Sequence, residues 1–180
     1  MAIINLLAIC GSLRTDSINR TLLHAAIRLS PADMEISMCP YIGKLPLYNP
    51  DLEHPVPDQV AGFRAQIADS QALLIASPEY AHGVTGSLKN ALDWLVSFEP
   101  FANKPVALLN ASPRAHHADA ALREILKTMS AELVEAASIT VPLLGAELTE
   151  DEIASHPVIS IAIVSALLEL QASTSHRISH

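Results

Sequence analysis

Four polar side chains near the start of the chain have the chemistry to bind a phosphate group: Ser12, Arg14, Ser17 and Asn19. Their hydroxyl and amide groups can form neutral hydrogen bonds with phosphate oxygens. Arg14, the only cation between residues 11 and 19, can add a charge-assisted, two-pronged bond. The loop has a single glycine and matches neither common glycine-rich phosphate motif. A plain polar loop in which Ser or Asp caps a helix is the alternative interpretation.

The segments on either side of this loop favour the phosphate interpretation. An apolar run over residues 3–10 predicts a buried parallel strand, and an amphipathic segment over residues 21–29 predicts a helix. A helix that begins after the loop presents free backbone N–H groups and the positive end of its dipole, and both attract an anion. The strand, the loop and the helix together predict an anion-binding arrangement.

A second segment, residues 77–94, reads S-P-E-Y-A-H-G-V-T-G-S-L-K-N-A-L-D-W, follows an apolar run over residues 72–76 and also opens a helix. With the first loop it resembles the NADPH-dependent FMN reductases, a flavodoxin-like group that includes quinone, chromate and azo-dye reductases. The family signatures are G-S-L-R-x-x-S-x-N and P-E-Y-N-x-x-x-x-G-x-L-K-N-A-x-D-W, and both occur here in the same order. The resemblance covers roughly residues 3–145.

The resemblance implies a noncovalently bound FMN. The first loop would hold its phosphate, main-chain groups of the second loop would hold the isoalloxazine ring, and the loop after the fourth strand would border that ring. The implied cofactor-binding residues are Ser12, Arg14, Ser17, Ile18, Asn19, Pro78, Glu79, Tyr80, Ala81 and Ser112. As a further hypothesis, Tyr80, His82 and Arg114 contact NADPH or the substrate.

The activity implied by the resemblance is that of an NAD(P)H-dependent oxidoreductase. Electrons would pass from NADPH or NADH through FMN to a quinone-like or other small acceptor, in a ping-pong cycle. Because the flavin carries the hydride, no catalytic side chain is expected. The alternative is a flavodoxin-like electron carrier that binds FMN without nicotinamide turnover.

Two departures from the family pattern motivate a third interpretation, a member that has lost its flavin. Ala81 stands where relatives carry Asn, and Arg114, His116 and His117 stand where relatives carry glycines. The family contact at position 81 is chiefly through the main chain, so we expect FMN binding to survive. The bulkier loop around Arg114 is expected to restrict the acceptors to flat or small molecules.

Apolar and amphipathic runs alternate along the chain and predict an α/β fold. Strands are expected at residues 3–10, 34–38, 72–77, 105–110 and 136–141, and helices at 19–29, 57–68, 87–98, 119–129 and within 150–171. The short connections favour one doubly wound, five-stranded parallel sheet of flavodoxin-like order 2-1-3-4-5, which binds ligands at the carboxyl ends of its strands. We expect one domain over residues 1–172 and a frayed tail over residues 173–180.

The composition argues against several other classes of protein. The 180 residues are enough for one domain, and 50% of them are hydrophobic. The formal net charge of −8 argues against nucleic acid as a partner. The sequence contains no C-x-x-C or H-E-x-x-H motif, so no metal site is expected. Cys10 and Cys39 end two expected strands and are interpreted as core residues.

The longest apolar stretch, residues 158–170, is too short to cross a bilayer. It is apolar on more than one face, so we expect a homodimer or homotetramer that covers the second face. The sequence shows no secretory leader pattern, and we therefore expect a cytoplasmic protein whose partner is a small-molecule electron acceptor.

Overall fold

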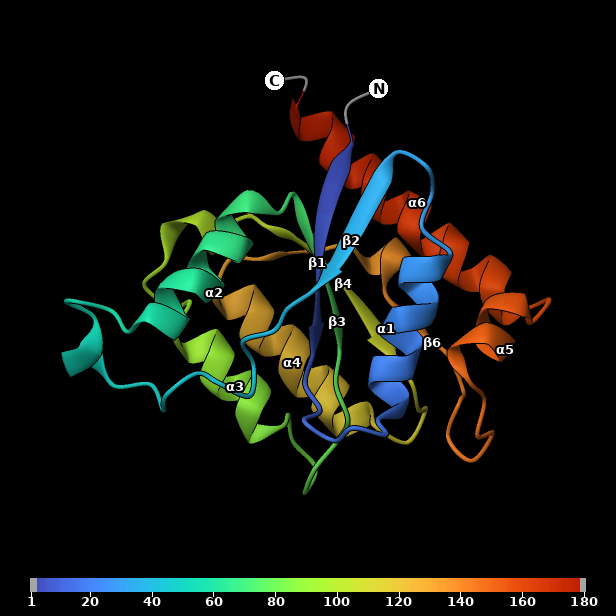
Figure 1. The fold of residues 1–180 in the computed structure, drawn as a ribbon, viewed down its shortest axis with the longest axis horizontal. Coiled ribbons are helices and arrows are strands. Elements are labelled where there is room, and N and C mark those ends of the chain that lie inside the picture. Colours follow the sequence, from blue (N-terminus) through green and yellow to red (C-terminus); the bar gives the residue numbers. More distant parts are fainter. Residues whose placement is uncertain (1–2, 179–180) are drawn as a thin grey trace.

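Residues 3–178, which the computed structural model describes, form a parallel sheet with helices on both faces (Figure 1). The main strands are β1 (Ile4–Cys10), β2 (Met34–Met38), β3 (Ala72–Ala76) and β4 (Pro105–Asn110). The sheet order β2-β1-β3-β4-β5 confirms the predicted flavodoxin-like topology. Every residue of β3 is buried, because helices cover both faces of the sheet.

The helices form two layers. One face of the sheet is covered by α1 (Ile18–Arg28), α5 (Glu150–Ser155) and α6 (Ile159–Ile178), and the other by α2 (Asp58–Asp69), α3 (Gly86–Asp93) and α4 (His116–Thr128) (Figure 1). Leu6 and Ala8 of β1 belong to the core under α1 and α6, whereas Leu7 and Ile9 belong to the core under α2, α3 and α4. Two short 3₁₀ turns, η1 (Pro50–Leu52) and η2 (Glu99–Phe101), lie in the connections.

The prediction of a fifth strand at residues 136–141 was wrong in its bounds. Two short strands take the place of that single strand. Strands β5 (Glu132–Leu133) and β6 (Ile139–Thr140) pair separately with β4, and the 3₁₀ turn η3 (Glu135–Ala137) lies between them. The hydroxyl of Ser138 explains the interruption: it donates to the Val134 carbonyl (2.9 Å) and accepts from the Leu108 amide of β4 (3.1 Å). A side chain thus replaces one backbone hydrogen bond of the sheet.

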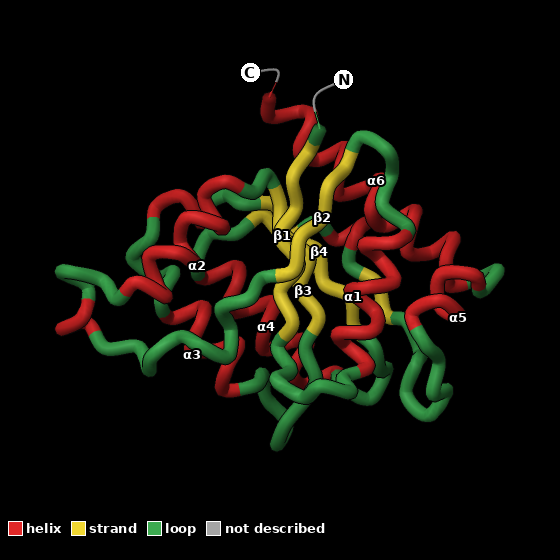
Figure 2. The backbone as a smooth tube through the Cα atoms, in the orientation of Figure 1, coloured by secondary structure: helices red, strands yellow, loops and turns green. Residues whose placement is uncertain are grey.

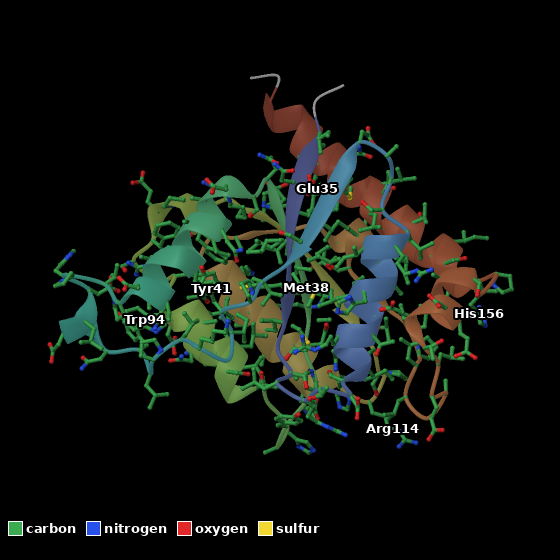
Figure 3. The ribbon with its side chains drawn as sticks, viewed as in Figure 1. Glu35, Met38, Tyr41, Trp94, Arg114 and His156 are labelled. Carbon is green, nitrogen blue, oxygen red and sulfur yellow. The ribbon has the colours of Figure 1, made fainter. Side chains whose placement is uncertain are left out.

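Helix α3 ends earlier than its apolar spacing predicts, at Asp93 instead of residue 98. Arg64 of α2 donates to the Trp94 carbonyl from Nε (3.0 Å) and from Nη2 (2.7 Å). The next turn of the helix would need that carbonyl. The Trp94 side chain is fully buried, and its Nε1 donates to the Pro46 carbonyl at 2.8 Å, which holds the loop before η1 against α3 (Figure 3).

The region expected to contain the last helix forms two, α5 and α6, separated at Pro157. Helix α6 continues to Ile178, beyond residue 172, and Thr174 is buried, so residues 173–178 are helical where we expected a frayed tail. Residues 179 and 180 lie outside the described residues. Within residues 3–178, no helix combines the length and the apolar character that a bilayer crossing requires.

Candidate functional site

The loops that follow β1, β3 and β4 gather at one end of the sheet, at the bottom of Figure 2. The register pairs Cys10 with Ala76, so β1 and β3 end at the same level. The carbonyl of Gly11 accepts hydrogen bonds from the hydroxyls of Thr85 (2.7 Å) and Ser87 (3.0 Å) at the start of α3. These bonds join the two loops that carry the family signatures.

Gly11 is required by the close approach of the β1 and β3 ends. A Cβ atom at this position would lie 2.2 Å from the Ser77 hydroxyl oxygen and 3.2 Å from that of Thr85. Any larger residue would therefore force the two loops apart. The single glycine of the first motif is explained by this contact.

Three of the four phosphate-type side chains are enclosed. Ser12, Ser17 and Asn19 are at most 5% exposed, whereas Arg14 is exposed. Ser17 occupies the N-cap position of α1, yet its side chain makes no capping hydrogen bond. The buried Oδ1 of Asn19 has no hydrogen-bond partner among the described residues. Buried polar atoms are rarely left unpaired, so Asn19 is suited to a ligand that carries a donor.

The second loop makes a tight turn at its tip. Tyr80 and Gly83 exchange two backbone hydrogen bonds, of 3.1 and 3.0 Å. Between them Ala81 (φ 47°) and His82 (φ 58°) both adopt the left-handed conformation, which disfavours residues with a Cβ atom. This turn projects from the end of the molecule, and the side chain of Tyr80 is 51% exposed.

Glu79 has a structural role that the sequence did not indicate. Its carboxylate accepts a hydrogen bond from the Ala118 amide (2.9 Å) in the first turn of α4. This bond holds the pKa of the Glu79 carboxyl below its usual value, and the nearby His117 and His82 act in the same direction. The added cap accounts for the start of α4 at His116, three residues before the predicted start at residue 119.

Three histidines form a stack between the second loop and the start of α4. The rings of His82 and His117 are 4.4 Å apart and nearly parallel, and the rings of His116 and His117 are 4.1 Å apart. No group of three or more His, Cys, Asp or Glu side chains in the described part of the chain is arranged to hold a metal ion. The ring contact between His82 and His117 joins the second loop to the start of α4.

A cavity of about 270 Å³ lies where these loops meet. Six predicted site residues line it: Ile18, Asn19, Pro78, Glu79, Ser112 and Arg114. The other six predicted residues do not line the cavity. Three lie in the β1–α1 loop (Ser12, Arg14 and Ser17), and three lie in the projecting turn (Tyr80, Ala81 and His82). Figure 3 shows Arg114 at the same end of the molecule as these loops.

The sequence analysis missed some of the lining. Ser77, Asn110, Ala111, Ala115 and Leu144 also face the cavity. The sequence did mark Asn110, because it is the polar residue that ends the apolar run of β4. In the structure its Oδ1 accepts from the Ser112 amide (3.0 Å). Leu144 had none, because it comes from the connection after β6.

A doubly wound parallel sheet with a cavity at the carboxyl ends of β1, β3 and β4 defines a flavodoxin-like protein. The sequence model of the family described as NADPH-dependent FMN reductase matches residues 4–143, and the chain belongs to this family.

Known relatives are similar over part of their length. A 2-hydroxy-1,4-benzoquinone reductase of a Burkholderia species is 46% identical over 86 residues, which are 48% of this chain and 46% of the relative. An NAD(P)H-dependent FMN reductase of Pseudomonas aeruginosa is 45% identical over 112 residues, 61% of this chain and 60% of the relative. The matches thus span about half to three fifths of these relatives.

One solved structure is similar over nearly the whole chain. The flavoenzyme NAD(P)H:(acceptor) oxidoreductase FerB of Paracoccus denitrificans superimposes with a TM-score of 0.68 at 27% identity. The superposition covers 97% of this chain and 94% of that one.

Proposed function

We propose that this chain is an FMN-dependent oxidoreductase that takes electrons from NADPH or NADH and passes them to a quinone-like or other small acceptor. The observation that carries the proposal is the meeting of the two family signatures at one cavity. Asn19 of the first motif and Pro78 of the second line the same space, together with Ser112 from the loop after β4.

The residues fit FMN. Ser12, Arg14, Ser17 and Asn19 would hold the phosphate, together with the N–H groups at the start of α1. The Oδ1 of Asn19 has no hydrogen-bond partner among the described residues, and a hydroxyl of the flavin side chain could donate to it. Main-chain groups of Pro78, Glu79, Tyr80 and Ala81 would border the ring.

When bound, FMN supplies the chemistry of accepting a hydride from the nicotinamide and releasing electrons to the acceptor. The protein's part is to bind and orient. The Glu79 carboxylate is hydrogen-bonded to α4 and has a lowered pKa, so it is ionised at neutral pH and does not serve as a proton donor. Tyr80, His82 and Arg114 are exposed at the cavity end of the molecule and would meet NADPH or the acceptor.

The test begins with the visible spectrum of the purified protein. A bound flavin gives a yellow protein, NADPH should bleach it without oxygen, and a quinone should restore the colour. If NADPH and the acceptor bind in turn at the same face of the flavin, double-reciprocal plots of rate against acceptor concentration at several NADPH concentrations should give parallel lines. Bleaching by dithionite but not by NADPH or NADH would identify an electron carrier, and equal wild-type affinities for riboflavin and FMN would contradict the phosphate assignment.

The homodimer or homotetramer and the cytoplasmic location remain predictions. The region of helix α6 supports the oligomer: Ile161 (70% exposed) and Leu168 (48%) on the helix and Val158 (70%) just before it are apolar and exposed. Light scattering should give a mass of two or four chains, and Ile161→Glu should lower it. A monomer mass of 19.3 kDa at micromolar concentration would contradict the prediction.

A further inference from the structure

We propose that Arg20, rather than the loop residues alone, gives this site its preference for a phosphorylated flavin. The proposal rests on the proposed function, because it concerns the phosphate of FMN. Arg20 lies outside the G-S-L-R-x-x-S-x-N motif, in the first turn of α1. Its guanidinium is the cation positioned to meet an anion at the β1–α1 loop.

The guanidinium of Arg20 is incompletely satisfied. Its Nη2 donates a long hydrogen bond to the Ser12 carbonyl (3.5 Å), which places the group against the β1–α1 loop. Its Nε is buried and has no hydrogen-bond partner within the described part of the chain. A buried N–H of a charged group without an acceptor is unfavourable, and an anionic oxygen would satisfy it.

The charges of the loop itself cancel. Residues 11–17 contain one cation, Arg14, and one anion, Asp16, and both are exposed. Positive charge nearby strengthens the binding of a phosphate dianion, and the side chains of this loop contribute no net charge. Arg20 supplies it from the adjoining turn of the helix, in a protein whose formal net charge is −8.

Arg20 also differs from arginines that stabilise the fold. Arg28 pairs with Glu150 and Asp151, Arg64 with Glu53, and Arg123 with Asp119 and Glu135. Among the side chains that the structure describes, up to residue 174, no carboxylate lies within ion-pair distance of Arg20. Its positive charge is therefore available to a ligand.

The neighbouring residue gives a second, independent observation. Asn19 is 3% exposed, lines the cavity and leaves its Oδ1 without a partner among the described residues. Two consecutive residues at the start of α1 thus hold unsatisfied polar atoms. Together with the N–H groups of the helix start, they form a site for a phosphate joined to a hydroxyl-bearing chain.

Flavin-free protein is titrated with FMN and with riboflavin, and flavin fluorescence quenching gives both dissociation constants. Arg20→Gln removes the charge and keeps a donor for the Ser12 carbonyl, so the fold should be retained. We expect FMN affinity to fall about ten- to a hundredfold, with riboflavin affinity unchanged. Arg28→Ala, on the same helix, is the matched control and should alter neither.

Equal losses for FMN and riboflavin would show that Arg20 only supports the loop, and an unchanged FMN affinity would show that it plays no part; either result overturns the proposal. Stabilisation of the flavin-free protein by inorganic phosphate is a separate readout. If the wild type binds no flavin, the proposed function fails. The anion site then stands only if phosphate raises the melting temperature of the wild type and not of Arg20→Gln.

Discussion

The two ends of the cavity are built differently. At the β1–α1 end, Ser12, Ser17 and Asn19 are enclosed, and the Thr85 hydroxyl fixes the Gly11 carbonyl. At the other end, the turn at Ala81 projects from the molecule in a left-handed conformation and is joined to α4 by exposed imidazoles. A substitution at the enclosed end should therefore cost stability, and one at the projecting end should alter ligand choice.

The largest effect is expected from Gly11→Ala at the enclosed end. The new Cβ would collide with the Ser77 side chain, and overpacking of this kind costs about 1–3 kcal/mol. Each kcal/mol lowers the melting temperature of a domain this size by roughly 2–4 °C. Thermal denaturation measures it, and FMN affinity should fall as the loops separate.

Gly86→Ala is the matched control, because nothing lies within 4 Å of a Cβ built at that position. Gly86 is the first residue of α3, where Ala is the better helix former. Its melting temperature should be unchanged or slightly higher. If the two variants melt alike, the tight contact at Gly11 does not exist in solution.

At the projecting end, replacing Arg114, His116 and His117 together with Ala should change turnover more than stability. Ala suits this triple variant better than Gly, because His116 and His117 lie in the first turn of α4. We expect kcat/KM for bulky quinones to rise by up to about tenfold, which is 1.4 kcal/mol in the transition state, with unchanged FMN affinity. If NADPH-dependent bleaching is lost while FMN stays bound, the segment holds the nucleotide instead of limiting the acceptor.

A smaller effect, a gain in stability, is expected from Ala81→Asn, because Asn tolerates the left-handed conformation better than Ala does. The variant should be more stable by about 0.5–1 kcal/mol in urea denaturation. Ala102→Asn is the control, since Ala102 is exposed with φ −59° and offers no strain to relieve. Equal stabilities of both variants would show that the turn at Ala81 is not strained.

The smallest effect is expected from Glu79→Gln and depends on pH. The Ala118 amide lowers the pKa of Glu79 in the folded protein. The ionised carboxylate therefore contributes stability above its unfolded pKa of about 4.3, and this contribution is lost as pH falls through the folded value. The variant should melt below the wild type at pH 7, and the difference should vanish in acid.

Glu152→Gln is a matched control for this carboxylate, since Glu152 caps α5 away from the cavity. Within its capping box, the Glu152 carboxylate accepts from the Thr149 amide (2.8 Å), as the Glu79 carboxylate accepts from the Ala118 amide (2.9 Å). Both variants should lose stability at pH 7, and Glu79→Gln alone should alter FMN affinity. If Glu79→Gln still melts below the wild type at a pH under about 3, the charge of the Glu79 carboxylate is not the cause of the difference in melting temperature.

The sheet order, the first four strands and both signature loops could be predicted from the sequence, because they depend on local apolar patterns and motif spacing. Three of the errors share one physical cause, a side chain that bonds to the backbone of a distant element. Arg64 binds the Trp94 carbonyl and ends α3 at Asp93, Glu79 starts α4 at His116, and Ser138 interrupts the fifth strand. Periodicity within a window contains no information about such bonds.

The candidate site was predictable to the same degree. Residues that belong to a motif, such as Asn19 and Pro78, reached the cavity as expected. Leu144 was missed because its position depends on how β6 leaves the sheet. Arg20 was passed over because it lies one residue beyond the motif, and only its buried Nε marks it.

Strand β6 gives one wall of the cavity a local stability of its own. The Val141 amide donates to the Asn110 carbonyl (2.8 Å) and the Leu143 amide to that of Ala111 (3.1 Å), and these bonds lead the chain to Leu144. Two residue pairs join β6 to β4, whereas five join β1 to β3. The amides of Val141 and Leu143 should therefore exchange with deuterium through local opening of β6. A ligand that fills the cavity should slow this exchange. Deuterium uptake at these two amides would thus report that the cavity is occupied, even by a colourless compound.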